Sequence, residues 1–263
     1  MIKTSSMGIE KGHKKMGKLS IVGIGPGDLR LLTEKAKRAI EEADVLVGYK
    51  VYIDLIEPII REKRIISTGM RGEIERCKRA ISLAIGGDNV VVISSGDPGI
   101  YAMAGLIFEL INKNNIIPHI EVIPGISALN AAASKLGAPI MHDFATISLS
   151  DLLTPWHIIE KRIEAAASAD FVIVIYNPKS KKREKQIVEA VNIISRYRSG
   201  NTPVGIVRNA YRDDESIVIT NLKEMLGHPI DMLCTIIIGN SKTFVYKNWI
   251  VTPRGYDSKY NLH

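Results

Sequence analysis

The chain has few of the residues that bind metals or form disulfides. Only two of its 263 residues are cysteines, Cys77 and Cys234, and they stand far apart without a CxxC pair. This excludes a disulfide-rich framework and predicts two buried thiols in a reducing compartment. None of the six histidines has the spacing of a metal ligand relative to another histidine, cysteine or carboxylate. We therefore predict no protein-bound metal.

Long apolar runs are also missing. No stretch reaches the ~18 uninterrupted apolar residues that a membrane-spanning helix needs. The first sixteen residues, MIKTSSMGIEKGHKKM, are basic and lack the apolar core of a secretory signal. We expect a disordered basic tail over 1–17, a short second tail over 256–263, no membrane association and a cytoplasmic protein.

Familiar nucleotide and hydrolase fingerprints are absent. GIGPGD at 23–28 starts like a dinucleotide-binding loop, but its third glycine comes one residue early. The second predicted strand ends in Gly48-Tyr49, so no acid is placed to bind a ribose. The chain has no GxxxxGK[ST] loop and no GxSxG elbow around Ser94-Ser95-Gly96. These observations argue against a dinucleotide enzyme, a P-loop enzyme and a serine hydrolase.

What the sequence does contain is a regular alternation of strands and helices. Apolar runs such as KLSIVG, NVVVISS and DFVIVIYNP predict buried strands, and apolar residues at helical spacing separate them. This pattern predicts an α/β protein with mostly parallel sheets. Gly137-Ala138-Pro139 is the predicted hinge between an N-terminal α/β domain, 18–137, and a C-terminal one, 138–255. Thr154, before Pro155, is the predicted cap of a helix.

Glycine, proline and small polar residues gather where the predicted strands end. In open α/β sheets, ligands bind beyond the carboxyl ends of the strands. Five such stretches follow predicted strands: 23–28, 94–98, 124–128, 176–178 and 208–210. We expect a ligand site to form there.

The net charge of +7 suggests an acidic partner: nucleic acid, an anionic membrane or a small molecule rich in carboxylates. The densest basic run, KSKKREK at 179–185, has no interleaved aromatic residues for base stacking. A basic nucleic-acid-binding module stays an alternative function, although a solvated helix face explains the run as well.

Several of these stretches together resemble a known family. GIGPGDLRLLT, GDPGIYAMAG and VIPGISALNAAASKLGAP, in this order and spacing, resemble the tetrapyrrole (corrin/porphyrin) methylases, and the resemblance extends from Lys18 to about Arg254. GYKVYIDLI, HDFATISLSDLLTPW, DFVIVIYNPKSKKR and VRNAYR are similar to members that methylate carbon 17 of a precorrin-3B or cobalt-factor III type macrocycle and contract its ring, in cobalamin biosynthesis. The alternatives within this fold are an enzyme acting at another ring position and one acting on a diphthamide precursor.

The resemblance implies two α/β domains with S-adenosylmethionine (SAM) in a cleft between them, S-adenosylhomocysteine as product, and a homodimer. It implies a polycarboxylate corrinoid or tetrapyrrole substrate, with or without cobalt, and no nucleic-acid partner. The SAM-binding residues that it implies are Pro26, Gly96, Asp97, Ile100, Ser127, Ala128, Asn177, Ala210 and Thr235. For Asp97, a hydrogen bond to the backbone or a cap on the following helix is the alternative role.

Transfer of a methyl group from a sulfonium needs alignment more than a nucleophile. Ring contraction and lactone closure would also need a proton acceptor or donor. The candidates for that task are His142, Tyr49, Asp151 and Tyr176. Arginines are expected to bind the carboxylate arms of the macrocycle, and the candidates are Arg71, Arg183, Arg208 and Arg212.

Overall fold

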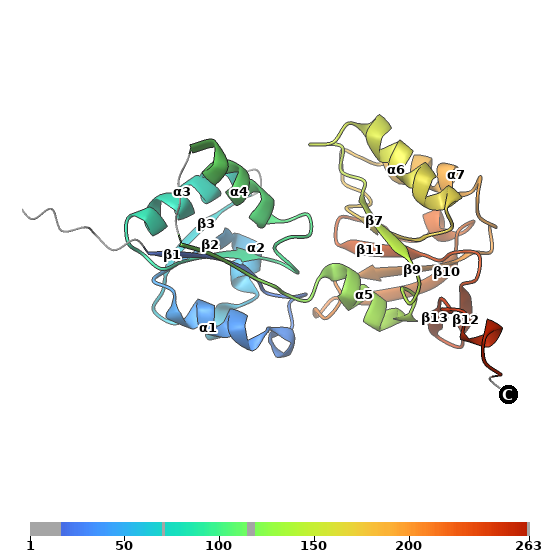
Figure 1. The fold of residues 1–263 in the computed structure, drawn as a ribbon, viewed down its shortest axis with the longest axis horizontal. Helices are drawn as coiled ribbons and strands as arrows, with labels where there is room; N and C mark the ends of the chain where they lie inside the picture. Colours follow the sequence, from blue (N-terminus) through green and yellow to red (C-terminus); the bar gives the residue numbers. More distant parts are fainter. Residues whose placement is uncertain (1–16, 70–71, 115–118, 262–263) are drawn as a thin grey trace, which may run out of the picture.

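Two α/β lobes follow one another along the chain (Figure 1). The computed structural model describes residues 17–69, 72–114 and 119–261. The basic tail, apart from Gly17, and the candidate Arg71 therefore lie outside the described residues. In this part of the chain, no helix is both long enough and apolar enough to cross a membrane.

The first lobe is built on a parallel five-stranded sheet in the order β3-β2-β4-β1-β5. The strands are β1 Lys18–Gly23, β2 Val45–Tyr49, β3 Arg64–Thr68, β4 Val90–Ser94 and β5 His119–Ile123. Side chains of β1 and β4 are buried on both faces, because α1 covers one face and α3 and α4 cover the other (Figure 1). The helices are α1 Glu34–Glu42, α2 Lys50–Asp54, α3 Glu73–Ile85 and α4 Met103–Asn114. This double cover explains the continuous apolar runs in the sequence.

The second lobe contains a mixed sheet in the order β10-β9-β11-β8-β7. Only β7 and β8 are parallel neighbours here; the other three pairs are antiparallel. The strands are β7 Phe144–Ser148, β8 Val172–Tyr176, β9 Pro203–Arg208, β10 Ser216–Asn221 and β11 Cys234–Ile238. Helices α6 Trp156–Ser168 and α7 Lys185–Ile194 pack on one face, and α5 Ala128–Leu136 packs on the other. The predicted α/β class with mostly parallel sheets is confirmed, since parallel pairs outnumber antiparallel ones over both lobes.

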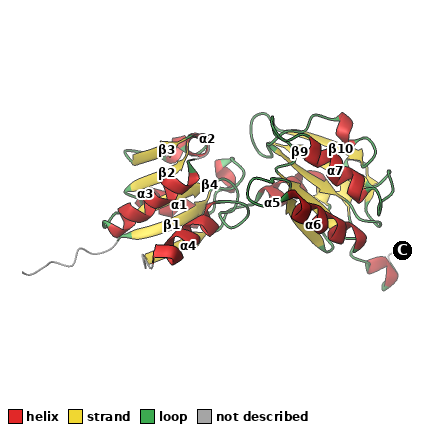
Figure 2. Ribbon diagram, turned by 90° about the horizontal axis from the view of Figure 1, so that it is seen from above, coloured by secondary structure: helices red, strands yellow, loops and turns green. Residues whose placement is uncertain are grey.

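Short elements complete the structure. A small sheet joins β6 Gly137–Ala138 to the hairpin of β12 Phe244–Tyr246 and β13 Trp249–Val251. Single-turn 3-10 helices form η1 Leu29–Leu31, η2 Glu57–Ile59, η3 Met225–Gly227 and η4 Tyr256–Ser258. Seen from above, α3 and α4 lie over the first sheet, and α6 and α7 lie over the second (Figure 2).

Helix α5 packs with the second lobe, although it precedes the predicted hinge. Its buried Leu129 and Leu136 share a core with Val174, Val207 and Ile237 of the second sheet. A boundary drawn by packing therefore falls before α5, and not after Gly137 as the sequence suggested. An alanine-rich helix fits against either sheet, so its periodicity could not assign it to a lobe.

One predicted helix start is wrong in detail. Thr33 caps α1 by accepting a hydrogen bond from the Ala36 amide at 3.2 Å, as expected. Thr154 does not cap α6, because Pro155 occupies the cap position and no side chain bonds to the first turn.

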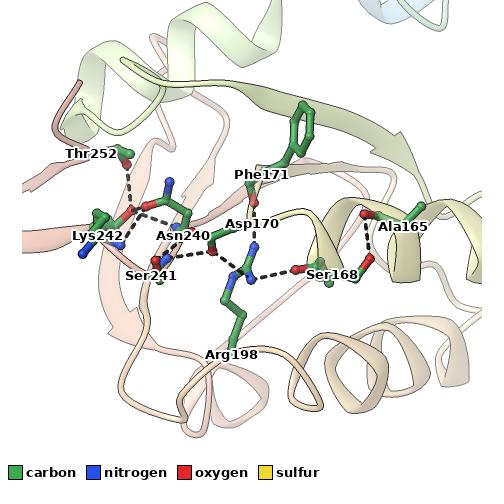
Figure 3. A network of polar contacts seen from close by, with 11 residues as sticks. Ala165, Ser168, Asp170, Phe171, Arg198, Asn240, Ser241, Lys242 and Thr252 are labelled. Atoms are coloured by element: carbon green, nitrogen blue, oxygen red, sulfur yellow. Dashed lines mark hydrogen bonds and ion pairs between the residues drawn. The ribbon is translucent and has the colours of Figure 1, made fainter. Parts of the chain in front are cut away.

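A buried arginine holds the outer side of the second lobe together (Figure 3). The Arg198 guanidinium, 3% exposed, lies 2.9 Å from an Asp170 carboxylate oxygen and donates to the carbonyls of Ala167 and Phe171. Asp170 also accepts hydrogen bonds from the amide and hydroxyl of Ser241. The turn between α6 and β8 is thus fastened to the loop after β11.

Candidate functional site

Three glycine-containing loops interlock at the carboxyl edge of the first sheet. The backbones of Gly25 and Gly96 exchange two hydrogen bonds, of 3.2 and 2.8 Å. A Cβ on Gly125 would lie 2.2 Å from the Gly96 carbonyl oxygen, and one on Gly23 would lie 2.5 Å from the same atom. Only glycine permits such close approach of three backbones. The loops after β1, β4 and β5 therefore form one surface.

Asp97 joins two of these loops. Its Oδ1 accepts a hydrogen bond from the Gly99 amide at 2.8 Å, and its Oδ2 accepts one from the Gly125 amide at 3.2 Å. Both oxygens thus bond to backbone, which is one of the alternatives drawn from the sequence. The other alternative, a cap on the following helix, is wrong, because α4 begins only at Met103.

The amino end of α5 lies against this surface. Ser127 is the cap residue, and its hydroxyl accepts a hydrogen bond from the Asn130 amide at 3.2 Å. Ala128 is the first helical residue, and a Cβ on Gly96 would lie 3.6 Å from its amide nitrogen. The next amide, of Leu129, donates to the hydroxyl of Tyr176 at 2.7 Å.

Tyr176 connects the second sheet to the first. Its ring centroid lies 5.3 Å from that of Tyr101, in the loop after β4. The Tyr101 hydroxyl in turn donates to the Thr146 carbonyl of β7 at 2.9 Å. Burial raises the pKa of Tyr176, so its phenol is protonated at neutral pH. The loop that contains Ile100 and the amino end of α5 at Ala128 therefore both lie beside the end of β8.

Strained backbone is concentrated at the same edge. Tyr101, Asn177, Asn209 and Tyr211 have φ angles of 52°, 50°, 47° and 62°, in the left-handed region that costs energy for residues other than glycine. Such conformations cluster at functional sites when the surroundings hold them in place. Here the surroundings do so: Asn177 donates to Ser148 at 2.9 Å, and the Tyr211 amide donates to Glu215 at 2.6 Å.

Ala210 and Thr235 lie on this edge as well. Ala210 stands between the two left-handed residues that follow β9. Thr235 is 7% exposed and is the register partner of Val207. Because β11 runs opposite to β8 and β9, its first residues lie beside their last ones.

Arg212 crosses from the second lobe to the first. Its Nε donates to the Pro26 carbonyl at 2.6 Å, and its Nη2 donates to the Ser95 hydroxyl at 3.1 Å. A Cβ placed on Gly27 would lie only 3.0 Å from the Cγ of Arg212, so the arginine side chain packs against this glycine. Burial lowers the pKa of this guanidinium.

His142, in contrast, lies away from the cluster. It precedes β7, at the opposite edge of the sheet from Ser148, which ends that strand. Its Nδ1 accepts a hydrogen bond from the Asp143 amide, and the Asp143 carbonyl accepts one from the first residue of β8. The expectation that His142 joins the site is not met, because the loop between β6 and β7 leads to the amino end of β7, and the site residues lie at the other end of that strand.

The other acid–base candidates lie at the carboxyl edges. Tyr49 ends β2, and its ring makes an edge contact with Tyr52 at 5.2 Å. Asp151 follows β7 and accepts a hydrogen bond from Gln186 at 2.8 Å.

Two of the arginines expected to bind substrate are engaged within the protein. Arg183 is 7% exposed and donates to the Leu149 carbonyl at 2.9 Å. Arg208 pairs with Asp214 at 2.7 Å and with Asp231 at 2.9 Å, and the hydrogen bond to Asp231 is the main cause of its raised pKa. The sequence could not show this, because the acidic partner Asp231 lies 23 positions away.

Ser95, Tyr101 and Ser148 also contribute contacts at this edge, although none of them was named individually as a site residue from the sequence. Each of the three lies inside or next to a motif already described from the sequence, and that proximity was the only sequence feature that pointed to them. Their contacts depend on the other lobe or on a neighbouring strand.

A hollow of about 270 Å³ lies elsewhere, beside α1 and the starts of β1 and β4. Its charged lining residues include Lys18 and Lys35, which both pair with Glu121. None of the predicted site residues lines it. Within the described ranges, no group of three or more histidines, cysteines or carboxylates is placed to hold a metal.

Comparisons with known proteins agree with the motifs. A family model described as Tetrapyrrole (Corrin/Porphyrin) Methylases matches residues 18–226. A cobalt-factor III methyltransferase of Priestia megaterium is 55% identical over 251 residues, which make up 94% of this chain and 46% of that protein. The chain thus spans about half the length of that relative.

Two further relatives are matched over nearly their whole length. A probable cobalt-factor III C(17)-methyltransferase of Salmonella typhimurium is 50% identical over 238 residues, 90% of this chain and 99% of that one. The crystal structure of the methyltransferase CobJ superposes with a TM-score of 0.85 at 35% identity, over 90% of this chain and 100% of that chain. The resemblance drawn from the motifs is confirmed: this chain belongs to the tetrapyrrole (corrin/porphyrin) methylase family.

Proposed function

We propose that this protein is a SAM-dependent C-methyltransferase that methylates carbon 17 of a precorrin-3B or cobalt-factor III type macrocycle and contracts its ring, in cobalamin biosynthesis. The observation that carries the proposal is the joined edge of the two sheets, in a chain of this family. There the loops of the first lobe meet the second lobe, through Tyr101 against Tyr176 and through Pro26 and Ser95 bonded to Arg212.

The residues at this edge fit a small ligand with an amino-acid head and an adenosine. Gly96 has a φ of 65°, and the space a side chain would fill faces the amino end of α5. Backbone groups in such loops can bind polar ligand edges without bulk. In this proposal the loops after β1, β4 and β5 and the amino end of α5 hold SAM through Pro26, Gly96, Asp97, Ile100, Ser127 and Ala128. The loops of the second sheet contribute Asn177, Ala210 and Thr235.

SAM, when bound, supplies an already activated methyl group. The task of the protein is then to align the acceptor carbon and to exclude water, and alignment of this kind can supply roughly 7–11 kcal/mol. Contacts such as Tyr101 to Thr146 fix the two lobes relative to each other, which this alignment requires.

Proton transfer during ring contraction is assigned to Asp151 or Tyr49, which lie at the carboxyl edges. Tyr176 is a poor proton acceptor at neutral pH, because burial raises its pKa and keeps the phenol protonated, and its oxygen already accepts the Leu129 amide. His142 is set aside because of its position at the start of β7.

We further propose a cytoplasmic homodimer whose partner is the polycarboxylate macrocycle, with metal present only inside the substrate. Both cysteines are buried free thiols whose pKa burial raises to about 11, which suits a reducing compartment. The basic run at 179–185 does not act as one exposed patch, since Arg183 is buried and Lys179 lies 3.8 Å from Glu184. This arrangement disfavours a nucleic-acid-binding module.

Calorimetry with SAM and S-adenosylhomocysteine tests the binding of the methyl donor. Incubation with SAM and cobalt-factor III or precorrin-3B should then add the mass of one methyl group and change the absorbance as the ring contracts. Methylation without contraction would favour another ring position. Absence of SAM binding, together with RNA affinity that falls steeply with salt, would favour the nucleic-acid module.

A further inference from the structure

We infer that Arg212 binds a carboxylate of the ligands where the two lobes meet. The inference rests on the proposed function, which supplies two carboxylate-bearing ligands. One is the methyl donor, through its amino-acid head, and the other is the macrocycle, through its acetate and propionate arms.

The contacts of Arg212 place its charge at the proposed site. The residue belongs to the loop after β9, yet it donates to Pro26 and Ser95 in two loops of the other lobe. Pro26 is itself one of the residues proposed to hold SAM, so the guanidinium borders the ligand position.

Arg212 forms no close ion pair within the described part of the chain, although Asp214 attracts its charge from a greater distance. Its Nε and Nη2 bond to a carbonyl and a hydroxyl, which are neutral, and it forms no ion pair with a described carboxylate. Two other arginines of the second lobe differ: the buried Arg198 pairs with Asp170, and the half-buried Arg208 pairs with two aspartates. A partly buried guanidinium without an anionic partner is costly, and a ligand carboxylate would compensate its charge.

Two carboxylates of the same loop are held by other groups. Asp214 bonds to Arg208 and Asn209, and Glu215 lies 3.0 Å from Lys135 and accepts the Tyr211 amide. These bonds stop the two carboxylates from turning to Arg212 without breaking other contacts.

Several contacts hold the loop that carries Arg212 in its observed conformation. Asn209 and Tyr211 both have left-handed backbone, and the Arg212 amide donates to the Asn209 carbonyl at 3.0 Å. The Tyr211 hydroxyl lies 2.8 Å from that of Ser134, and Lys135 stacks over the Tyr211 ring at 3.8 Å. Helix α5 therefore holds the loop, and Arg212 is positioned before a ligand arrives, which favours binding.

The test measures the affinity of each ligand separately for Arg212→Gln and Arg212→Lys. Calorimetry uses S-adenosylhomocysteine and its analogue without the α-carboxylate, and an absorbance titration uses cobalt-factor III without methyl donor. Arg196→Gln removes the same charge from an exposed position, 63% exposed, at the end of α7 and serves as the matched control. Thermal unfolding checks that each variant folds.

We expect Arg212→Gln to lower the affinity for one of the two ligands by about 10- to 100-fold, as for loss of a charge-assisted hydrogen bond. Arg212→Lys should lower the same affinity less. Weaker binding of S-adenosylhomocysteine, but not of its analogue without the carboxylate, identifies the methyl donor as the source. Weaker binding of cobalt-factor III alone identifies an arm of the macrocycle.

Two results overturn the inference. If the wild type binds both ligands and folded Arg212→Gln binds them as Arg196→Gln does, Arg212 does not bind a carboxylate and the proposed function stands. If the wild type binds neither ligand, the proposed function fails, and the inference about Arg212 fails with it.

Discussion

The Asp97 carboxylate accepts a hydrogen bond from the Gly125 amide at 3.2 Å, which ties the loop after β4 to the loop after β5. Its other oxygen accepts the Gly99 amide within its own loop. One acidic side chain thus fixes the shape of the surface on which we propose that SAM binds.

Asp97→Asn should loosen this surface. The asparagine keeps one acceptor oxygen, but its NH2 group would face one of the two amides, so a hydrogen bond is lost. We expect the free energy of unfolding to fall by about 1–3 kcal/mol and the affinity for S-adenosylhomocysteine to fall with it, measured by chemical denaturation and calorimetry. Asp257→Asn, at an exposed position, is the control; equal effects of the two substitutions would contradict a joining role for Asp97.

Gly125→Ala should disrupt the site more severely. The added methyl would lie 2.2 Å from the Gly96 carbonyl oxygen and 2.7 Å from Gly23 backbone, and neither can move independently of its loop. We expect loss of S-adenosylhomocysteine binding and a marked fall in melting temperature.

Gly105→Ala provides the contrast for that substitution. It lies within α4, and a Cβ there meets nothing within 4 Å. Because alanine favours helix over glycine, this variant should gain about 0.5–1 kcal/mol in stability. Similar behaviour of the two variants would refute the close packing of the loops.

Tyr176→Phe should destabilise the amino end of α5. The Leu129 amide would lose its acceptor, the hydroxyl at 2.7 Å, and an unpaired buried donor costs about 1–3 kcal/mol. Tyr197→Phe removes a hydroxyl bonded to Glu164 on the surface and should cost less than about 1 kcal/mol. Denaturation curves of both variants decide this, and equal losses would argue against the role given to Tyr176.

Glu121 should make the stability of the protein depend on pH in acid. Hydrogen bonds from Lys18 and Lys35 lower the pKa of Glu121 from 4.5 to about 2 in the folded state. The stabilisation by Glu121 is therefore complete above about pH 4.5 and is lost as the pH falls toward 2.

Glu121→Gln should consequently lower the free energy of unfolding above pH 4.5 and reduce its change between pH 4.5 and 2. Urea denaturation across this range measures both effects. Glu75→Gln, on the exposed side of α3, should leave the pH dependence of stability unchanged. If Glu121→Gln also matched the wild type, the ion pairs of Glu121 would not be the cause of the loss of stability in acid.

Most strands, most helices and the loops of the site were predictable from the sequence, whereas β3 and β12 were not among the predicted strands. Continuous apolar runs identify strands covered on both faces, and glycines at their ends identify close approach of backbone. The mixed direction of the second sheet was not predictable, because Cys234–Ile238 is equally apolar whether its neighbours run parallel or antiparallel to it.

The roles of individual polar residues were harder to predict than the elements. Arg208 and Arg212 lie in the same motif and look equivalent as sequence. The structure pairs one with two aspartates and brings the other to the opposite lobe without an ion pair among the described residues.

The order of most elements, the glycine loops and the family follow from the sequence alone, because these depend on local spacing and on motifs read along the chain. Packing in three dimensions places α5 with the second lobe, His142 away from the site, and Arg212 against Pro26. Those outcomes depend on which surfaces and charges become neighbours after folding, and residues almost two hundred positions apart carry no local signal of that contact.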